Sequence, residues 1–379
     1  LLDTKALEHP DRILADFFEA GVKLTYADLA SQSKCFANSL ARLGVRKGTH
    51  VAIVAPNSSA YLVSWFAIGR IGAVMIPVNH RYVSRELEFV LTDADAQFLI
   101  IDESCLPTFE EIAPCPPLLQ DGEIIVIGKE AKGCLSFDEV ASQSSADFIP
   151  TQPVTQSDLL AIQFTSGSTG FPKGCMQSHM YWLLVGVAID RLRRAADNQP
   201  SERVLITYPF FYMMAQMEFL LAIYTGGTAF IANKPSLTKF MTWVKTYRIH
   251  YCAMNPMVYR GLPPDDGDHD NELRFIAAYY HTGDTLRELE ARFNTVGRDS
   301  YGMTETGSGT IMPAAATHML DSASCGLPSL FREFRILDEQ GNELPPGENG
   351  ELCMAGKGMF WGYYKRPKTN RESFHGRWF

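Results

Sequence analysis

One stretch, residues 164–174, constrains this chain more than any other, and it reads Phe-Thr-Ser-Gly-Ser-Thr-Gly-Phe-Pro-Lys-Gly. Four of its residues carry hydroxyl groups, and Lys173 adds a positive charge. Glycines let backbone N–H groups turn toward one point, and such a nest binds anionic oxygens. Hydroxyls add hydrogen-bond donors, and a lysine ammonium neutralises phosphate. The stretch therefore predicts a polyphosphate-binding loop, whose candidate binding residues are Thr165, Ser166, Gly167, Ser168, Thr169, Gly170 and Lys173.

The position of this loop supports the same interpretation. The apolar run 159–164 precedes it, so the loop begins where a buried strand is expected to end. Open α/β sheets bind ligands at the carboxyl ends of their strands. A Ser/Gly-rich surface turn is the alternative, because most such clusters are turns. A Walker A loop fits poorly, since Pro172 precedes Lys173 and a glycine follows it.

Length, charge and cysteine usage narrow the class of protein. The 379 residues exceed the size at which a single core grows comfortably, so two or three lobes are expected. A formal net charge of −9 disfavours nucleic acid as a partner. Eight scattered cysteines without a C-x-x-C pair predict reduced thiols. We expect no transmembrane segment, no signal segment and a cytoplasmic location.

The order of apolar runs predicts an α/β fold with two doubly wound, mostly parallel sheets and flanking helices. A capping box at Thr25 and Asp28 should open the first long helix, and Gly44 should follow its end. In the first half, strands are expected at 50–55, 73–78, 98–101 and 124–127, and helices at 25–43, 59–71 and 84–93. In the second half, strands are expected at 159–164, 204–208, 228–232, 251–254 and 275–280, and helices at 180–194, 213–224, 237–247 and 286–293.

Composition also predicts a division into three parts. Residues 129–157 are rich in Ser, Gln, Asp and Pro and predict a linker. We therefore expect a first α/β subdomain over 1–150 and a second, with the phosphate loop, over 151–323. Short strands and Gly-rich turns then predict a small β-rich, β-barrel-like subdomain over 324–379.

A second stretch, residues 299–306, reads Asp-Ser-Tyr-Gly-Met-Thr-Glu-Thr. A tyrosine beside glycine can stack on a nucleotide base, threonine can donate to phosphate, and glutamate can bind Mg²⁺ through oxygen. Alone, such a string is more often an ordinary turn. Its significance comes from its occurrence together with the loop at 164–174.

Together, residues 164–174 and the string Tyr301-Gly302-Met303-Thr304-Glu305 resemble the adenylate-forming superfamily of acyl- and aryl-CoA synthetases, luciferases and peptide-synthetase adenylation domains. Further similarity at 24–29, 209–211, 347–352, 362–364 and 376–379 extends the resemblance over essentially the whole chain. The resemblance implies that a small-molecule carboxylic acid and ATP form an acyl-adenylate and pyrophosphate, and that the thiol of coenzyme A then takes the acyl group. It also implies Mg²⁺, and a homodimer is the default expectation.

The same resemblance implies a role for each motif residue. Residues from Thr165 to Lys173 would hold the β- and γ-phosphates. Tyr301 would stack on adenine, Thr304 would contact the α-phosphate, and Glu305 would bind Mg²⁺. In-line attack on phosphorus needs positioning and charge stabilisation rather than a protein nucleophile. The implied catalytic residues are Lys173, Thr304 and Glu305, and the ATP-binding set adds Gly283, Asp284, Thr285, Ser300, Gly302 and Met303.

One string mimics a family motif at the wrong place. Residues 281–284 read His-Thr-Gly-Asp, but the motif that supplies an aspartate to the ribose should come just after residue 379. We therefore give residues 283–285 a role on the adenine side of the site. The alternative is that Asp284 or Thr285 caps a helix that starts at Leu286.

Two further departures leave the activity open. Tyr212 stands where many acyl-CoA synthetases carry a histidine, and we predict that Tyr212, Met213 and Gln216 line the acyl pocket. The alternative is that the methionines here are ordinary core. We also expect the family's small C-terminal domain, with its catalytic lysine, to be absent from this chain. A ligase that acylates a carrier protein, and a non-catalytic nucleotide- or acyl-adenylate-binding protein, therefore remain open.

Overall fold

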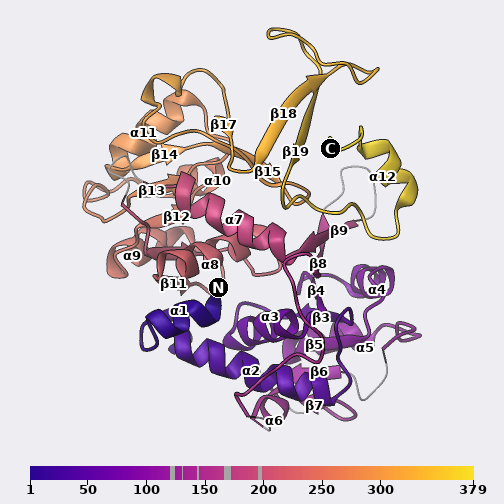
Figure 1. Cartoon of the computed structure of the whole chain (residues 1–379). Coiled ribbons are helices and arrows are strands. Elements are labelled where there is room, and N and C mark those ends of the chain that lie inside the picture. Colours follow the sequence, from indigo (N-terminus) through magenta and orange to yellow (C-terminus); the bar gives the residue numbers. More distant parts are fainter. Residues whose placement is uncertain (120–123, 130, 143–144, 166–171, 195–198) are drawn as a thin grey trace. The chain divides into compact units, whose positions relative to one another are not determined.

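The computed structural model describes residues 1–119, 124–129, 131–142, 145–165, 172–194 and 199–379 (Figure 1). Contacts divide the chain into two compact units. Unit 1 comprises residues 1–179, 208–216 and 361–365, and unit 2 comprises residues 180–207, 217–360 and 366–379. Both units mix strands and helices, and the division into three subdomains made from composition stays a prediction.

Unit 1 contains a seven-stranded sheet in the order β7-β6-β5-β3-β4-β8-β9. All neighbouring strands are parallel except β8 and β9, which pair antiparallel. The expected mostly parallel sheet is therefore confirmed, and β8 joins it beside β4. The strands are β3 (His50–Val54), β4 (Val74–Pro77), β5 (Phe98–Asp102), β6 (Ile124–Ile127), β7 (Leu135–Ser136), β8 (Leu159–Thr165) and β9 (Lys173–Ser178).

Helices cover both faces of this sheet, with α2 and α3 on one face and α4 and α5 on the other (Figure 1). An antiparallel pair, β1 (Ile13–Phe17) and β2 (Val22–Thr25), precedes them. Helix α6 and strand β7 lie within 129–157, where composition predicted only a linker. The helices of unit 1 are α1 (Leu2–Glu8), α2 (Tyr26–Arg42), α3 (Ser59–Ile71), α4 (Ser84–Asp93), the 3-10 turn η1 (Glu103–Cys105), α5 (Leu106–Glu110) and α6 (Phe137–Ser142).

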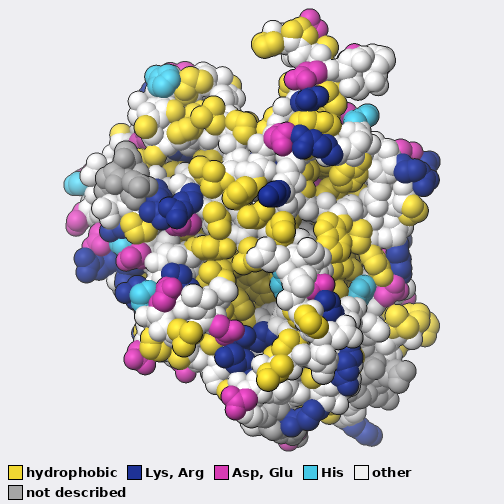
Figure 2. Space-filling view, viewed as in Figure 1, with side chains coloured by type: hydrophobic (Ala, Val, Ile, Leu, Met, Phe, Trp, Pro, Cys, Tyr) yellow, Lys and Arg dark blue, Asp and Glu magenta, His cyan; other side chains and the backbone are white. Residues whose placement is uncertain are grey.

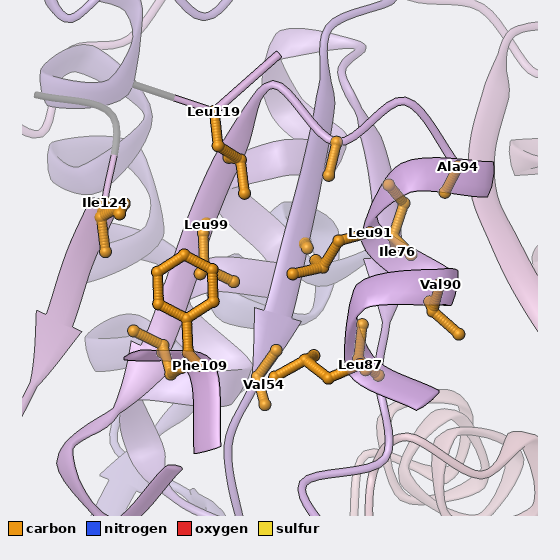
Figure 3. Close-up of a cluster of buried hydrophobic side chains, with 14 of the residues drawn as sticks. Val54, Ile76, Leu87, Val90, Leu91, Ala94, Leu99, Phe109, Leu119 and Ile124 are labelled. Carbon is orange, nitrogen blue, oxygen red and sulfur yellow. The ribbon is translucent and has the colours of Figure 1, made fainter. Parts of the chain in front are cut away.

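A buried apolar cluster lies between α4, α5 and the sheet (Figure 3). Leu87 and Leu91 of α4 and Phe109 of α5 meet strand side chains such as Val54 and Leu99. Burying each large apolar side chain stabilises the fold by about 1.5–3 kcal/mol. Unit 1 therefore has a core of its own, which supports the strands that carry the phosphate loop.

The parallel part of the second large sheet runs β14-β13-β12-β10-β11 within unit 2. Its strands are β10 (Arg203–Ile206), β11 (Thr228–Ile231), β12 (Tyr251–Ala253), β13 (Phe275–Ala277) and β14 (Val296–Arg298). Only β14 was not expected. The helices of this half of the sequence are α7 (His179–Leu192), α8 (Met213–Thr225), α9 (Leu237–Thr246), α10 (Pro256–Gly261) and α11 (Gly283–Phe293).

The last part of the chain contains short antiparallel strands, as expected, but the described strands do not close a barrel. Strands β15 (Ser300–Met303), β16 (Gly307–Ile311) and β17 (Leu327–Pro328) form a three-stranded sheet. Strands β18 (Arg332–Leu337) and β19 (Glu351–Gly356) form a separate two-stranded ribbon. A barrel needs every edge to be paired, and this ribbon has only two strands. The 3-10 turn η3 (Thr317–Met319) and helix α12 (Pro367–Ser373) complete the elements.

Surface charge, cysteine state and helix apolarity can each be compared with what the sequence predicts. On the face shown in Figure 2, Lys and Arg side chains lie interspersed with Asp and Glu, so neither sign dominates that face. All eight cysteines are free thiols, as expected. None of the helices in the described part of the chain combines the length and apolarity needed to cross a bilayer.

Local signals determine both ends of α2. Thr25 Oγ1 accepts a hydrogen bond from the Asp28 N–H at 3.0 Å, and the Asp28 carboxylate accepts one from the Thr25 N–H at 2.9 Å. This is the expected capping box. At the other end, Gly44 has a φ of 109°, and the N–H groups of Gly44 and Val45 donate back to carbonyls of the last turn. That pattern is a Schellman motif, so the predicted end is also confirmed.

Replacing the capping threonine should weaken this helix. Thr25→Ala is expected to lower the free energy of unfolding by about 1 kcal/mol, because the Asp28 N–H loses its acceptor. Urea unfolding followed by circular dichroism measures the change. Ser31→Ala, at an exposed position of the same helix, is the control and should cause no loss. Equal losses in the two variants would contradict the capping role.

Candidate active site

The phosphate loop connects two paired strands in unit 1. Thr165, the last residue of β8, lies directly opposite Lys173, the first residue of β9, and its Oγ1 donates to the Lys173 carbonyl at 3.4 Å. The expectation that the loop starts at the end of a buried strand is confirmed. Candidate residues Ser166, Gly167, Ser168, Thr169 and Gly170 lie outside the described residues, so their phosphate contacts stay predictions.

Gly174 serves packing. It lies inside β9, and a Cβ at this position would stand 2.5 Å from Cγ2 of Ile162 and 3.3 Å from the ring of Phe164. Any larger residue would therefore push β9 away from the side chains of β8. This differs from the interpretation made from sequence, which treated Gly174 as one of the glycines that free the loop backbone.

A small cavity in unit 1 joins the loop strand to the predicted acyl pocket. Its volume is about 60 Å³, and Phe164, Tyr82, Phe211 and Tyr212 contribute to its wall. The Tyr212 side chain is about half exposed. Small-molecule sites usually measure about 300–1,000 Å³, so this cavity alone accommodates only a small group. Met213 is half-buried and does not line it.

Polar side chains that are half-buried or buried hold the segment that precedes Tyr212. Asn57 Oδ1 accepts a hydrogen bond from the Phe210 N–H at 2.8 Å, and Tyr61 donates to the Phe210 carbonyl at 3.2 Å. Gln216 is fully buried, and its Nε2 also donates to the Phe210 carbonyl, at 2.7 Å. Its amide thus supports the backbone, and its role in the acyl pocket stays a prediction. Sequence reasoning missed Asn57, although its place in a turn directly after a buried strand was a signal.

In unit 2, the motif that begins at Tyr301 forms the β15–β16 hairpin. Tyr301 is 38% exposed, so part of this residue is accessible to a ligand. Its hydroxyl lies 3.6 Å from the sulfur of Met303. A Cβ on Gly302 would stand 2.5 Å from the carbonyl oxygen of Gly307. Only glycine therefore permits this close approach of the two strands.

Two buried side chains hold the turn that follows. Tyr181 donates to the Thr304 carbonyl at 2.9 Å, and Arg332 Nε donates to the Thr306 carbonyl at 2.9 Å. Both donors are buried. The Glu305 side chain is also buried, at 6% exposure. Sequence reasoning proposed Thr304 and Glu305, whose roles stay predictions. It missed the contacts of Tyr181 and Arg332, because nothing near these two residues in the sequence points to the turn.

A buried arginine reaches the first residue of β15. Arg193 is 4% exposed and donates to Ser300 Oγ at 3.2 Å and to the Tyr251 hydroxyl. Nearby, Glu218 is 1% exposed, and among the described residues neither carboxyl oxygen has a hydrogen-bond partner. Burial raises the pKa of Glu218 to about 8, and the charge of Arg193 opposes this only in part. At neutral pH the Glu218 carboxyl is therefore mainly protonated.

The segment 283–285 belongs to the first turn of α11, three residues earlier than expected. Its cap is Thr282, whose Oγ1 accepts from the Thr285 N–H at 3.4 Å. The suggestion that Asp284 or Thr285 is the cap is therefore wrong. A Cβ on Gly283 would stand 2.5 Å from the Leu320 carbonyl oxygen, so close packing requires glycine there. The Asp284 side chain is 95% exposed, and the adenine-side role stays a prediction.

The metal expectation rests on one residue. Among the described residues, no group of three or more His, Cys, Asp or Glu side chains could hold a metal ion. In nucleotide sites, Mg²⁺ is usually held by one or two carboxylates together with phosphate oxygens and waters. The carboxylate of Glu305 fits that donor set.

Comparison with known proteins agrees with the motifs. The family model described as AMP-binding enzyme matches residues 2–364. A feruloyl-CoA synthase from Amycolatopsis sp is 30% identical over 366 residues, which cover 95% of this chain and 70% of that protein. A crotonobetaine/carnitine–CoA ligase from Citrobacter koseri is 29% identical over 370 residues, with coverages of 93% and 69%.

Solved structures show the same fold. The N-terminal domain of FACL13 from Mycobacterium tuberculosis superposes with a TM-score of 0.87 at 21% identity, and covers 100% of this chain and 94% of that one. The anthranilate CoA ligase AuaEII, solved with anthranoyl-AMP, gives a TM-score of 0.88 at 20% identity, with coverages of 100% and 73%. The chain therefore belongs to the AMP-binding enzyme family, and its relatives place it among the AMP-forming acyl-CoA ligases.

The close approach at Gly302 predicts a strict need for glycine. Gly302→Ala is expected to lower the free energy of unfolding by about 1–3 kcal/mol, because the added Cβ forces β15 away from β16. Thermal or urea unfolding measures the loss. Ser308, which lies opposite Gly302 in the hairpin, offers the control. Ser308→Ala adds no atom and should leave stability nearly unchanged, and an equal loss in that variant would refute the steric explanation.

The raised pKa of Glu218 predicts a pH dependence of stability. An unfolded Glu ionises near its usual 4.5, whereas folded Glu218 keeps its proton up to about 8. Between these values the folded protein binds more protons than the unfolded chain, so stability falls as pH rises through this window. Glu218→Gln does not titrate and should lose less stability than wild type between about pH 5 and about pH 8.

Melting temperatures across that range measure the difference. Glu288→Gln, at an exposed position of α11, is the control and should follow wild type. If the curves of Glu218→Gln and wild type are parallel, Glu218 does not hold its proton in the folded state.

Proposed function

We propose that this protein is an ATP-dependent carboxylate–CoA ligase, which forms an acyl-adenylate with release of pyrophosphate and then an acyl-CoA thioester. The substrates are a small carboxylic acid, ATP and coenzyme A. The observation that carries the proposal is the family match over residues 2–364, because it includes both motif stretches. The relatives' names, feruloyl-CoA synthase and crotonobetaine/carnitine–CoA ligase, support CoA as the acceptor.

The proposed roles follow from the charge that the reaction moves. A carboxylate oxygen attacks the α-phosphorus of ATP, and the bond to pyrophosphate breaks, so negative charge builds up on the leaving group. Lys173 would bind the β- and γ-phosphates and stabilise that charge, and the Thr165 hydroxyl would join it by turning from the Lys173 carbonyl toward phosphate. In unit 2, Tyr301 would stack on adenine and Thr304 would contact the α-phosphate. Catalysis would then come from positioning the two substrates and from stabilising the charge on the leaving pyrophosphate.

Glu305 would be the protein ligand of Mg²⁺. When bound, the metal would neutralise phosphate charge and orient the reacting oxygens. The Glu305 side chain is buried, and hydrogen bonds from Tyr181 and Arg332 hold the backbone of the turn that carries it.

Substitution of the two charged residues tests this function. In the full-length protein, Lys173→Ala and Glu305→Ala should each lower carboxylate-dependent exchange between ATP and pyrophosphate by about 100-fold or more, because each removes charge stabilisation from the transition state. The assay is run with a panel of aryl, short-chain, long-chain and carnitine-like acids, which also identifies the substrate class.

Two exposed residues provide matched controls. Lys368→Ala and Glu288→Ala change the same charges at exposed positions and should retain exchange activity. Unchanged exchange in both Lys173→Ala and Glu305→Ala would overturn the assignment of the site. Absence of exchange with every acid in the wild type would overturn the ligase function itself.

A further inference from the structure

The segment 361–365 adds a further strand-like stretch to the phosphate-loop hairpin in unit 1. Three backbone hydrogen bonds, between 2.8 and 3.0 Å long, join it to β9. Within this ladder Tyr363 lies opposite Cys175 in an antiparallel bridge. The segment therefore covers the edge of β9 that β8 does not use.

This register places Tyr363 beside Lys173. Residues two apart on a strand share a face, so Lys173 and Cys175 point to the same side of β9. Tyr363, opposite Cys175, is then the diagonal neighbour of Lys173, a spacing that aromatic and long side chains can bridge. The Lys173 ammonium lies 4.5 Å from the centre of the Tyr363 ring. This is within the distance of about 6 Å for a cation–π interaction.

The ring is held independently of the lysine. Tyr363 is only 4% exposed. The next two residues attach the segment to the turn before β5, because the Asp95 carboxylate accepts hydrogen bonds from the Tyr364 hydroxyl at 2.9 Å and from Lys365 Nζ at 2.6 Å. The Tyr363 ring is therefore a fixed surface in unit 1, and Lys173, which is half-buried, is the adaptable partner.

We propose that Tyr363 is a positioning residue that holds the Lys173 ammonium in place for the β- and γ-phosphates of ATP. A free lysine side chain has many rotamers and loses that freedom when it binds phosphate. Contact with a fixed ring restricts the side chain before the nucleotide arrives, so less entropy is lost on binding. The inference rests on the proposed function, because it assumes that Lys173 contacts these phosphates.

Comparison of ATP with AMP tests the proposal. Tyr363→Leu should raise the dissociation constant of Mg²⁺–ATP by about threefold to thirtyfold, the range that a cation–π contact supports. The dissociation constant of AMP should stay the same, because AMP lacks the β- and γ-phosphates. Isothermal titration calorimetry measures both. If the role of Tyr363 were merely structural, Tyr363→Leu would weaken the binding of ATP and of AMP together, and that result would overturn the proposal.

Three further variants sharpen the test. Tyr363→Phe keeps the ring and should keep ATP affinity within about twofold of wild type. Trp361→Leu removes an exposed ring from the same segment, at 51% exposure, and should not weaken the binding of ATP selectively. If leucine at 363 unfolds the protein, Tyr363→Met fills the space without an aromatic face and replaces it in the comparison. A selective loss of ATP affinity in Trp361→Leu equal to that in Tyr363→Leu would mean that the segment, and not the Tyr363 ring, matters.

A double substitution separates this proposal from the proposed function. In a Lys173→Ala background, Tyr363→Leu should have no further effect on ATP affinity, because the interacting partner is gone. If Lys173→Ala alone leaves the ratio of ATP to AMP affinity unchanged, the phosphate role of Lys173 fails. If Lys173→Ala changes that ratio and Tyr363→Leu does not, only the positioning role of Tyr363 fails.

Discussion

The antiparallel pairing of β8 with β9 is the interaction on which the proposed phosphate site depends. It brings Thr165 directly opposite Lys173, so the two ends of the loop are held one strand spacing apart. Gly174 permits this pairing, since any Cβ there would collide with Ile162. The outer edge of β9 then pairs with the segment that carries Tyr363. One hairpin thus determines where the loop begins, where its lysine lies and what that lysine contacts.

In unit 2, buried polar side chains hold the turn that carries Glu305. The turn at 304–306 has no regular partner strand, so its carbonyl groups need donors from elsewhere. Tyr181 and Arg332 provide them from α7 and β18. A buried arginine is unfavourable unless its donors are satisfied, and Arg332 meets this condition by binding backbone carbonyls. Tyr181 and Arg332 therefore restrict the conformation of the turn at 304–306.

Much of the fold followed from local patterns. Periodicity predicted α3, α4 and β6 with the limits that the structure has, and the capping signals of α2 were confirmed. The misses have physical causes. Strand β7 has only two residues and lies in a polar stretch, so it shows no periodicity. At α11, Thr282 and Asp284 are both suitable N-cap residues by type, so the sequence does not decide between them. In the structure the helix starts at Gly283, where the Leu320 carbonyl packs too closely for any larger residue.

By itself, the sequence predicted the residue types of the site, since hydroxyls, glycines and a lysine together suit phosphate oxygens. It also determined the ends of α2, because capping acts over four residues. Tertiary structure alone decided that β8 joins the sheet of β3 and β4, that no barrel forms among the described strands, and that Tyr363 covers Lys173. These outcomes depend on which strand edges pair across long stretches of chain. Backbone hydrogen bonding is the same for every residue type except proline, so such pairing leaves little trace in the local sequence.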